Sequence, residues 1–308
     1  MEDVAPMPFV SVVMPNWNGK DDTLECLDSL RNLNYSKDRI EIIIVDNGSK
    51  DGSPETIKEK FSEMKQDGFF SLKLIELPEN IGAPAAINRG IKNAHSDYDY
   101  IFKIDNDVIF DNESLNELVK ASEKDERVGI AGGKVYFFEN RKLIQSAGGK
   151  INLWRGWAMT IGYKEMDVGQ YEKVQEVDWI CGASMLLKKK IVKEIGLFDD
   201  IYFVYYDETD FAIRTKRARY KVLYIPYAII WHKLSVAVQK IRNLSLHYMT
   251  RNRIIFQRKY SNNFQYLFFN LFFWFYEFPI RFIKEFRKDR RILGVFINAV
   301  REGYFTPI

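Results

Sequence analysis

The first third of the chain alternates short apolar runs with segments in which apolar residues recur every three or four positions. The apolar runs predict buried strands at residues 9–14, 40–45, 71–76 and 100–104. The recurring positions predict helices at residues 20–32, 54–64 and from Gly82 to about Asn93. Strands that alternate with helices indicate βαβ units and therefore an α/β fold with a mainly parallel central sheet.

Polar side chains follow the ends of these predicted strands. Asn16 and Asn18 follow the first strand, Asp46 ends the second, and Asp105 and Asp107 follow the fourth. In open α/β sheets ligands bind beyond the carboxyl ends of the strands. We therefore expect a binding site at this edge of the sheet.

The alternation loosens after residues 128–136, as it would where strands and loops build the second half of a site. We expect a helix at 187–195, an amphipathic helix that opens in 203–214, and short strands at 222–225 and 228–231. A basic helix at about 242–259 and an aromatic stretch from Phe264 follow.

Charge divides the chain into two parts. The 308 residues allow two domains, or one large domain with an appendage, and the formal net charge is +3. Residues 232–291 hold 13 Lys and Arg against three acids, so residues 1–231 carry a net charge of −7. An acidic body joined to a basic, aromatic tail suggests that the two parts meet different partners.

Several common kinds of site are excluded. The segment from Gly129 to Lys134 looks like a phosphate loop but has the wrong spacing and is followed by Val135. The sequence has no GxGxxG after a strand, no GxSxG elbow and no helical zinc spacing among its three histidines. Cys26 and Cys181 are too few for a disulfide framework or a four-ligand zinc site.

One acidic cluster follows a strand directly. In Asp105-Asn106-Asp107 alternate side chains can turn toward one point, and two carboxylates at that spacing suit Mg²⁺ or Mn²⁺. Asp and Asn are also frequent in solvated turns, so the cluster alone leaves both readings open. His232, which follows Trp231, is either structural or the third member of an Asp–Asp–His metal set.

A second acidic cluster opens the helix predicted in 203–214. Asp207, Glu208 and Asp210 could merely favour the helix dipole. The aromatic residues around them could instead raise the pKa of one carboxyl group enough to make it a base.

The motifs occur in a defined order, which is more specific than any one of them. They read VSVVMPNWNG, IIIVDNGSKDGS, PENIGAPAAINRG, IFKIDNDV, DWICGASMLLKKK, GLFDDIYFVYYDETDFAIR, WHK and HYMTRNR. Over residues 8–260 the chain resembles the inverting family 2 glycosyltransferases with the GT-A fold, most of all the rhamnosyl- and galactofuranosyltransferase-like branch. That branch usually has Glu-Asp where this chain has Asp207-Glu208, and more often Asn-Asn-Asp where it has Asp105-Asn106-Asp107.

The resemblance implies a role for each matching residue. It places the nucleoside of a nucleotide-diphosphate sugar against Pro15, Asn16, Asn18 and Asp46, with Asn80, Asn88 and Arg89 on the nucleotide side. Asn88 and Arg89 are equally compatible with a helix face. Asp105 would contact ribose or the metal, Asp107 and His232 would bind Mn²⁺ or Mg²⁺, and Trp179, Gly182 and Ala183 would shape the sugar pocket.

The same resemblance implies the reaction. Glu208 or Asp207 would deprotonate an acceptor hydroxyl, which would attack the anomeric carbon and invert it. The acceptor is expected to be a lipid-linked or polysaccharide glycan. A sugar nucleotidyltransferase and an inactive nucleotide-sugar-binding tether are the alternatives, and the tether would need neither acidic cluster.

The tail suggests contact with a membrane surface. Residues 264–276 are almost all apolar but too few for a span, and six basic residues against two acids fill 281–291. We expect a GT-A domain at 1–231 and a helical region at 232–308 that binds an anionic bilayer through 264–291. Packing on the core or in a homodimer is the alternative, whereas nucleic acid fits none of the motifs. The acidic N-terminus favours the cytosol, and hence the cytoplasmic face of the cell membrane.

Overall fold

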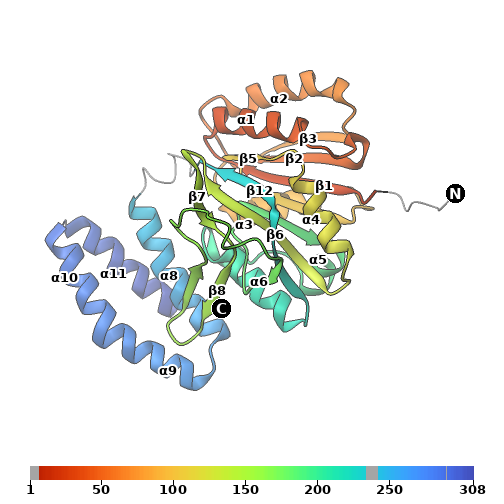
Figure 1. Cartoon of the computed structure of the whole chain (residues 1–308). Helices are drawn as coiled ribbons and strands as arrows, with labels where there is room; N and C mark the ends of the chain where they lie inside the picture. The colour runs from red at the N-terminus through yellow and green to blue at the C-terminus, as the bar shows by residue number, and fades with distance from the viewer. Residues whose placement is uncertain (1–6, 234–241, 289) are drawn as a thin grey trace.

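The computed structural model describes residues 7–233, 242–288 and 290–308. Figure 1 shows a body built around one large twisted sheet, and a group of helices from residues 242–308 (blue) gathered at one side of it. No helix in the described part of the chain is both long enough and apolar enough to cross a bilayer.

The first half of the sheet is parallel, as the sequence predicts. Its strands lie in the order β3 (Ser71–Glu76), β2 (Ile40–Asp46), β1 (Val10–Asn16) and β4 (Tyr100–Ile104). The helices between them are α1 (Lys20–Arg31), α2 (Ser53–Met64) and α3 (Ala83–Lys92). Because the four strands run in one direction, their carboxyl ends meet at a single edge.

The second half of the sheet is mixed. β11 (Ser184–Lys188) runs antiparallel to both β4 and β6 (Val128–Phe137). β12 (Lys221–His232) lies parallel to β6 and pairs at its end with β5 (Val108–Phe110). At the margins lie β7 (Asn140–Ser146), β10 (Gln175–Glu176) and a separate pair, β8 (Gly149–Asn152) with β9 (Trp157–Thr160).

Helices cover both faces of the sheet, which makes three layers. Buried residues of α1, α2 and α4 (Ser114–Glu123) pack on one face, against side chains such as Val12 and Met14 of β1. α3, α5 (Lys189–Ile195) and α6 (Asp207–Arg217) pack on the other, against Val13. Because successive side chains of each buried strand point to opposite faces of the sheet, each strand contributes to two hydrophobic cores.

Three predicted boundaries differ in the structure. Residues 187–188 belong to β11, because Leu187 pairs with Ile101, and the helix begins only at Lys189. Residues 203–206 precede α6 and are not helical. The strands expected at 222–225 and 228–231 are one strand with a bulge between Ile225 and Ile229. In each case the deciding contact lies far away along the sequence.

The predicted basic helix is present and joins the two parts of the molecule. α8 (Arg242–Tyr260) packs Ile255 and Phe256 against the body and Ile254 against the other C-terminal helices. Those are α9 (Asn263–Phe272), a π-helical turn (Phe273–Glu277), α10 (Phe278–Lys288) and α11 (Arg290–Phe305). The tail therefore has a small core of its own, and α8 is shared between that core and the body.

Candidate functional site

A cavity of about 480 Å³ opens at the carboxyl ends of the central strands. Its wall combines the end of β1, the turn after β4, the loop before β11, the start of α6 and the start of α8. The lining residues predicted from the sequence are Pro15, Asn16, Asn80, Asp105, Asp107, Gly182, Ala183, Asp207, Glu208 and His232. The cavity therefore gathers most of the predicted site, from Pro15 near the start of the chain to His232 at the end of β12.

Three of these residues form a compact group of possible metal ligands. Asp105, Asp107 and His232 each offer one ligand atom, and the three atoms lie within 4.8 Å of one another. Strand pairing brings them together, because His232 at the end of β12 pairs with Val108, next to Asp107. The Nε2 atom of His232 lies 3.1 Å from an oxygen of Asp107.

Gln145 orients the histidine ring, and no sequence motif points to it. Its Oε1 lies 2.9 Å from His232 Nδ1, and both side chains are buried. If Nδ1–H donates to that oxygen, the lone pair of Nε2 points at the carboxylates, as a metal ligand requires. Burial by itself would lower the pKa of His232, but the charge and hydrogen bond of Asp107 outweigh it and raise the pKa.

The donor set fits a divalent cation. Two carboxylates and one imidazole are suitable ligands for Mn²⁺, and the carboxylates also suit Mg²⁺. Lys103, another residue missed from the sequence, places its buried ammonium group 2.8 Å from Asp105 and bonds the carbonyl of Gly182. It supplies a fixed positive charge beside the same carboxylate.

The expected nucleoside side is an interlocked set of loop residues. Asn16 donates to Asp46 over 2.7 Å and accepts from Asn106 over 3.0 Å. Asp46 also accepts from the backbone N–H of Ser49, and Asn18, with a positive φ, accepts from that of Lys50. Asn16 lines the cavity, whereas Asp46 and Asn18 hold the two loops behind it.

Besides Asn18 and Asp46, three more of the expected residues do not line the cavity. Asn88 lies on the buried face of α3, where it bonds the backbone of Phe198 in both directions. Arg89 is exposed on the same helix. Trp179 packs closely over Gly149, since a Cβ atom there would come within 1.9 Å of its ring nitrogen.

The acidic pair at the start of α6 has two different environments. Asp207 is 5% exposed, and burial together with the adjacent Glu208 raises its pKa well above the usual range. A Cβ atom on Gly182 would meet both Glu208 Oε1 and Lys103 Nζ at 3.0 Å, so the backbone there approaches closely. Glu208 lies beside Lys103 at the cavity wall, whereas Asp207 is buried.

A strained turn places this pair. Phe203, Tyr205 and Tyr206 all have positive φ, which non-glycine residues rarely adopt. The Nδ2 atom of Asn252 on α8 donates to the carbonyls of Tyr202, Val204 and Tyr205 at 2.8–2.9 Å. This contact explains why the helix begins at Asp207, and it makes α8 part of the site.

The third acid of the cluster, Asp210, is structural. It is fully buried and accepts from Arg214 at 2.7 Å and from the hydroxyl groups of Tyr260 and Tyr202 at 2.5 and 3.1 Å. Lys259 also binds it. Asp210 therefore joins α6 to α8 and takes no part in the cavity.

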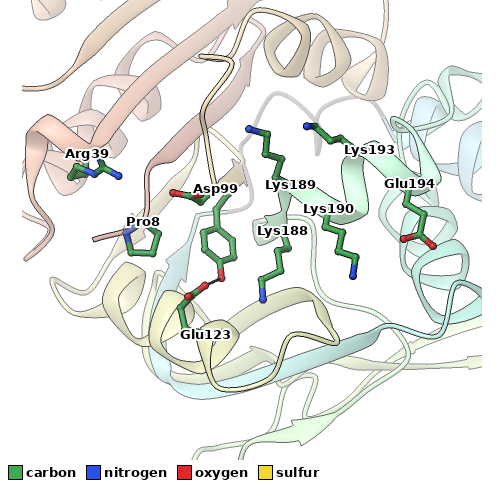
Figure 2. Close-up of a pocket in the computed structure, with 10 residues that line it drawn as sticks. Pro8, Arg39, Asp99, Glu123, Lys188, Lys189, Lys190, Lys193 and Glu194 are labelled. Atoms are coloured by element: carbon green, nitrogen blue, oxygen red, sulfur yellow. Dashed lines mark hydrogen bonds between the residues drawn. The ribbon is translucent and has the colours of Figure 1, made fainter. Parts of the chain in front are cut away.

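A larger hollow, of about 750 Å³, lies at the amino ends of β1 and β4. Figure 2 shows the ammonium groups of Lys189 and Lys193 on one side of it and those of Lys188 and Lys190 on the other. Lys188 and Lys189 donate to backbone carbonyls of Ser122 and Ser96. These cations do not converge on a common point, so the hollow is a poorer candidate than the acidic cavity.

Known proteins resemble the chain in sequence. The family model described as Glycosyl transferase family 2 matches residues 11–196. The probable glycosyltransferase YdaM of Bacillus subtilis (strain 168) is 28% identical over 234 residues, which cover 75% of this chain and 52% of that protein. A poly-beta-1,6-N-acetyl-D-glucosamine synthase of Staphylococcus aureus (strain MSSA476) is 27% identical over 235 residues, 74% of this chain and 51% of its own. The chain thus spans about half the length of these curated relatives.

Solved structures share the fold. The mannosyltransferase PcManGT from Pyrobaculum calidifontis, in complex with GDP-Man and Mn²⁺, has a TM-score of 0.62 at 18% identity, covering 99% of this chain and 79% of its own. GalNAc-T7 with UDP, GalNAc and Mn²⁺ has a TM-score of 0.60 at 15% identity, covering 74% of this chain and 43% of its own. These likenesses confirm the predicted GT-A fold.

Proposed function

The chain belongs to glycosyl transferase family 2, and on that premise we propose that it transfers a sugar from a nucleotide-diphosphate donor to a hydroxyl acceptor with inversion. One observation carries the proposal. A single cavity holds the possible metal ligands Asp105, Asp107 and His232 together with the acidic pair Asp207 and Glu208. Such a site can neutralise a leaving diphosphate and accept a proton from the attacking hydroxyl.

The donor would lie between the interlocked loops and the metal ligands. Asn16 and Asn80 would contact the nucleoside, with Asp46 and Asn18 holding their loops, and Gly182 and Ala183 would border the sugar. Asp105, Asp107 and His232 would hold Mn²⁺ or Mg²⁺, which supplies Lewis-acid stabilisation of the leaving diphosphate when it is bound. The contacts of Asn88 with Phe198 and of Trp179 with Gly149 favour supporting roles in packing, and the exposed Arg89 does not line the cavity.

Glu208 is the proposed base. Its carboxylate lines the cavity beside the buried ammonium group of Lys103. The raised pKa of the neighbouring, buried Asp207 favours its protonated form, and a protonated carboxyl group cannot accept the proton of the acceptor hydroxyl. Of the two acids, whose order is reversed relative to the rhamnosyl- and galactofuranosyltransferase-like branch, Glu208 is therefore the proposed base and Asp207 is not.

The tail supports a proposed place of action. Large side chains on α9, the π-helical turn and α10 are exposed, among them Phe264 at 78% and Phe275 at 80%. Arg281, Lys284 and Arg287 follow on α10. We propose that this surface binds an anionic bilayer at the cytoplasmic face and brings the cavity to a lipid-linked glycan acceptor. A homodimer through the same surface is the alternative.

A panel of nucleotide sugars tests the function. The full chain is incubated with each donor and Mn²⁺ or Mg²⁺, and released nucleoside diphosphate is measured. We expect release from at least one donor, and loss of release in Asp107→Ala and in EDTA. Pyrophosphate as the product would indicate a nucleotidyltransferase. Donor binding without turnover under any metal would indicate an inactive tether.

A further inference from the structure

A second, smaller cavity lies where the body meets the helical tail. Its volume is about 290 Å³, and its walls come from β9, the turn before α6, α8, the π-helical turn and α10. Trp157, Tyr206, Thr250, Arg253 and Arg281 provide its aromatic and polar lining. None of its lining residues lines the acidic cavity, but Tyr206 immediately precedes Asp207. The two cavities are therefore close neighbours.

A buried hydroxyl group in this cavity has no partner. Thr250 is 5% exposed, and its Oγ1 atom makes no hydrogen bond in the structure. A buried polar atom without a partner costs about 1–3 kcal/mol. A ligand that accepts a hydrogen bond from Thr250 would remove that cost.

The cavity also has an excess of positive charge. Arg253 lies 2.7 Å from a carboxylate oxygen of Glu277 and donates to the carbonyl of Arg155 over 2.9 Å. Arg281 lines the same cavity and forms no ion pair with any carboxylate among residues 7–233, 242–288 and 290–308. Of the two guanidinium groups that line the cavity, that of Arg253 is paired with a carboxylate, and that of Arg281 is a site for an anion.

The surroundings indicate what the anion is attached to. Phe273 lines the cavity, and the next two residues of the same turn, Trp274 and Phe275, are 42% and 80% exposed. If the anion bound at Arg281 carries an apolar chain, that chain can lie along this aromatic surface. Guanidinium and hydroxyl donors beside an apolar surface match a phosphate ester of a lipid.

We propose that this cavity binds the phosphoryl group of a lipid, held by Arg281 and Thr250. The phosphate belongs either to a lipid-linked acceptor or to a phospholipid headgroup. The first source rests on the proposed function, because it would deliver the acceptor beside Glu208. The second would fix the tail on the bilayer.

Phosphate binding to the full chain tests the site directly. Inorganic phosphate is titrated by calorimetry in EDTA, without donor, against wild type, Thr250→Val, Arg281→Gln and the control Arg301→Gln. Arg301 is an exposed cation on α11 and does not line the cavity. We expect Thr250→Val and Arg281→Gln each to weaken binding by about 10-fold, as for one hydrogen bond to a charged group, while Arg301→Gln binds as wild type. Equal melting temperatures show that the variants fold.

Vesicles of phosphatidylcholine with and without phosphatidic acid distinguish the two sources. A headgroup site requires Thr250→Val and Arg281→Gln to lose flotation with phosphatidic acid relative to Arg301→Gln. Equal flotation of all variants assigns the cavity to the acceptor's phosphate. The proposal is overturned if wild type binds no phosphate, or if both cavity variants bind it as tightly as wild type. Because no donor is present, failure of the proposed glycosyl transfer would leave this result unchanged.

Discussion

Protonation of His232 should control metal binding. Its Nε2 atom faces Asp107 at 3.1 Å, while Nδ1 lies 2.9 Å from Gln145, so a cation at the three-residue group must replace a proton on Nε2. Asp107 raises the pKa of the ring above its ordinary value of 6.5. Mn²⁺ affinity should therefore start to fall at a higher pH than for an ordinary histidine.

The size of the effect follows from one competing proton. Below the pKa of His232, each further pH unit should weaken Mn²⁺ binding by about tenfold. Gln145→Leu removes the acceptor that orients the ring, and loss of such a supporting contact costs about 10–100-fold in metal affinity. His232→Ala should bind Mn²⁺ more weakly at every pH and should also lose the part of the pH dependence that belongs to the ring.

The assay is a titration of the full chain with Mn²⁺, followed by the electron paramagnetic resonance of the free ion between pH 5.5 and pH 8.5. Asn140→Ala, on an exposed position of the same strand as Gln145, serves as the matched control. If His232→Ala binds Mn²⁺ with the affinity and pH dependence of wild type, the histidine is not a ligand and the reasoning fails.

Three further changes have defined outcomes. Glu208→Gln should lower turnover by about 10²–10⁴-fold with donor binding retained, as measured by product release and donor titration, and a greater loss in Asp207→Asn would reverse the assignment. Asp210→Ala leaves Lys259 and Arg214 without their buried partner and should cost about 3–5 kcal/mol of folding free energy in urea unfolding. A variant as stable as wild type would contradict its joining role. Phe264→Ser with Phe275→Ser should reduce flotation with anionic vesicles at low salt without changing the melting temperature, and unchanged flotation would argue against the tail surface.

The sequence suffices for the parts of the fold that depend on local pattern. The parallel strands and their helices follow from buried β-branched runs, and Asp105 and Asp107 follow from their place after β4. The start of α6 could not be predicted, because Asn252 holds the preceding turn through carbonyl contacts from another helix. Local pattern favours helix there, and the distant contact prevents it.

The supporting residues of the site were also beyond sequence reasoning. Gln145 looks like any polar strand residue until β7 is placed beside β6 and its side chain meets His232. Lys103 occupies a strand otherwise read as apolar, and only the close approach of Gly182 shows where its ammonium group lies. In the sequence, a lysine within an apolar run is the signal that marks Lys103 as unusual.

The double role of α8 limits how this molecule can be divided. A truncation at the charge boundary near His232 would remove Asn252 and with it the contacts that hold the turn before Asp207. Hybrid proteins that exchange the tail should therefore be joined after Tyr260, so that the recipient keeps its own helix. Even then Arg258 would lose its bonds to the carbonyls of Gly303 and Thr306, and Ile254 its neighbours. The tail of the other protein must therefore supply equivalent partners for these residues. Whether an exchanged tail fits is thus decided by its contacts with α8.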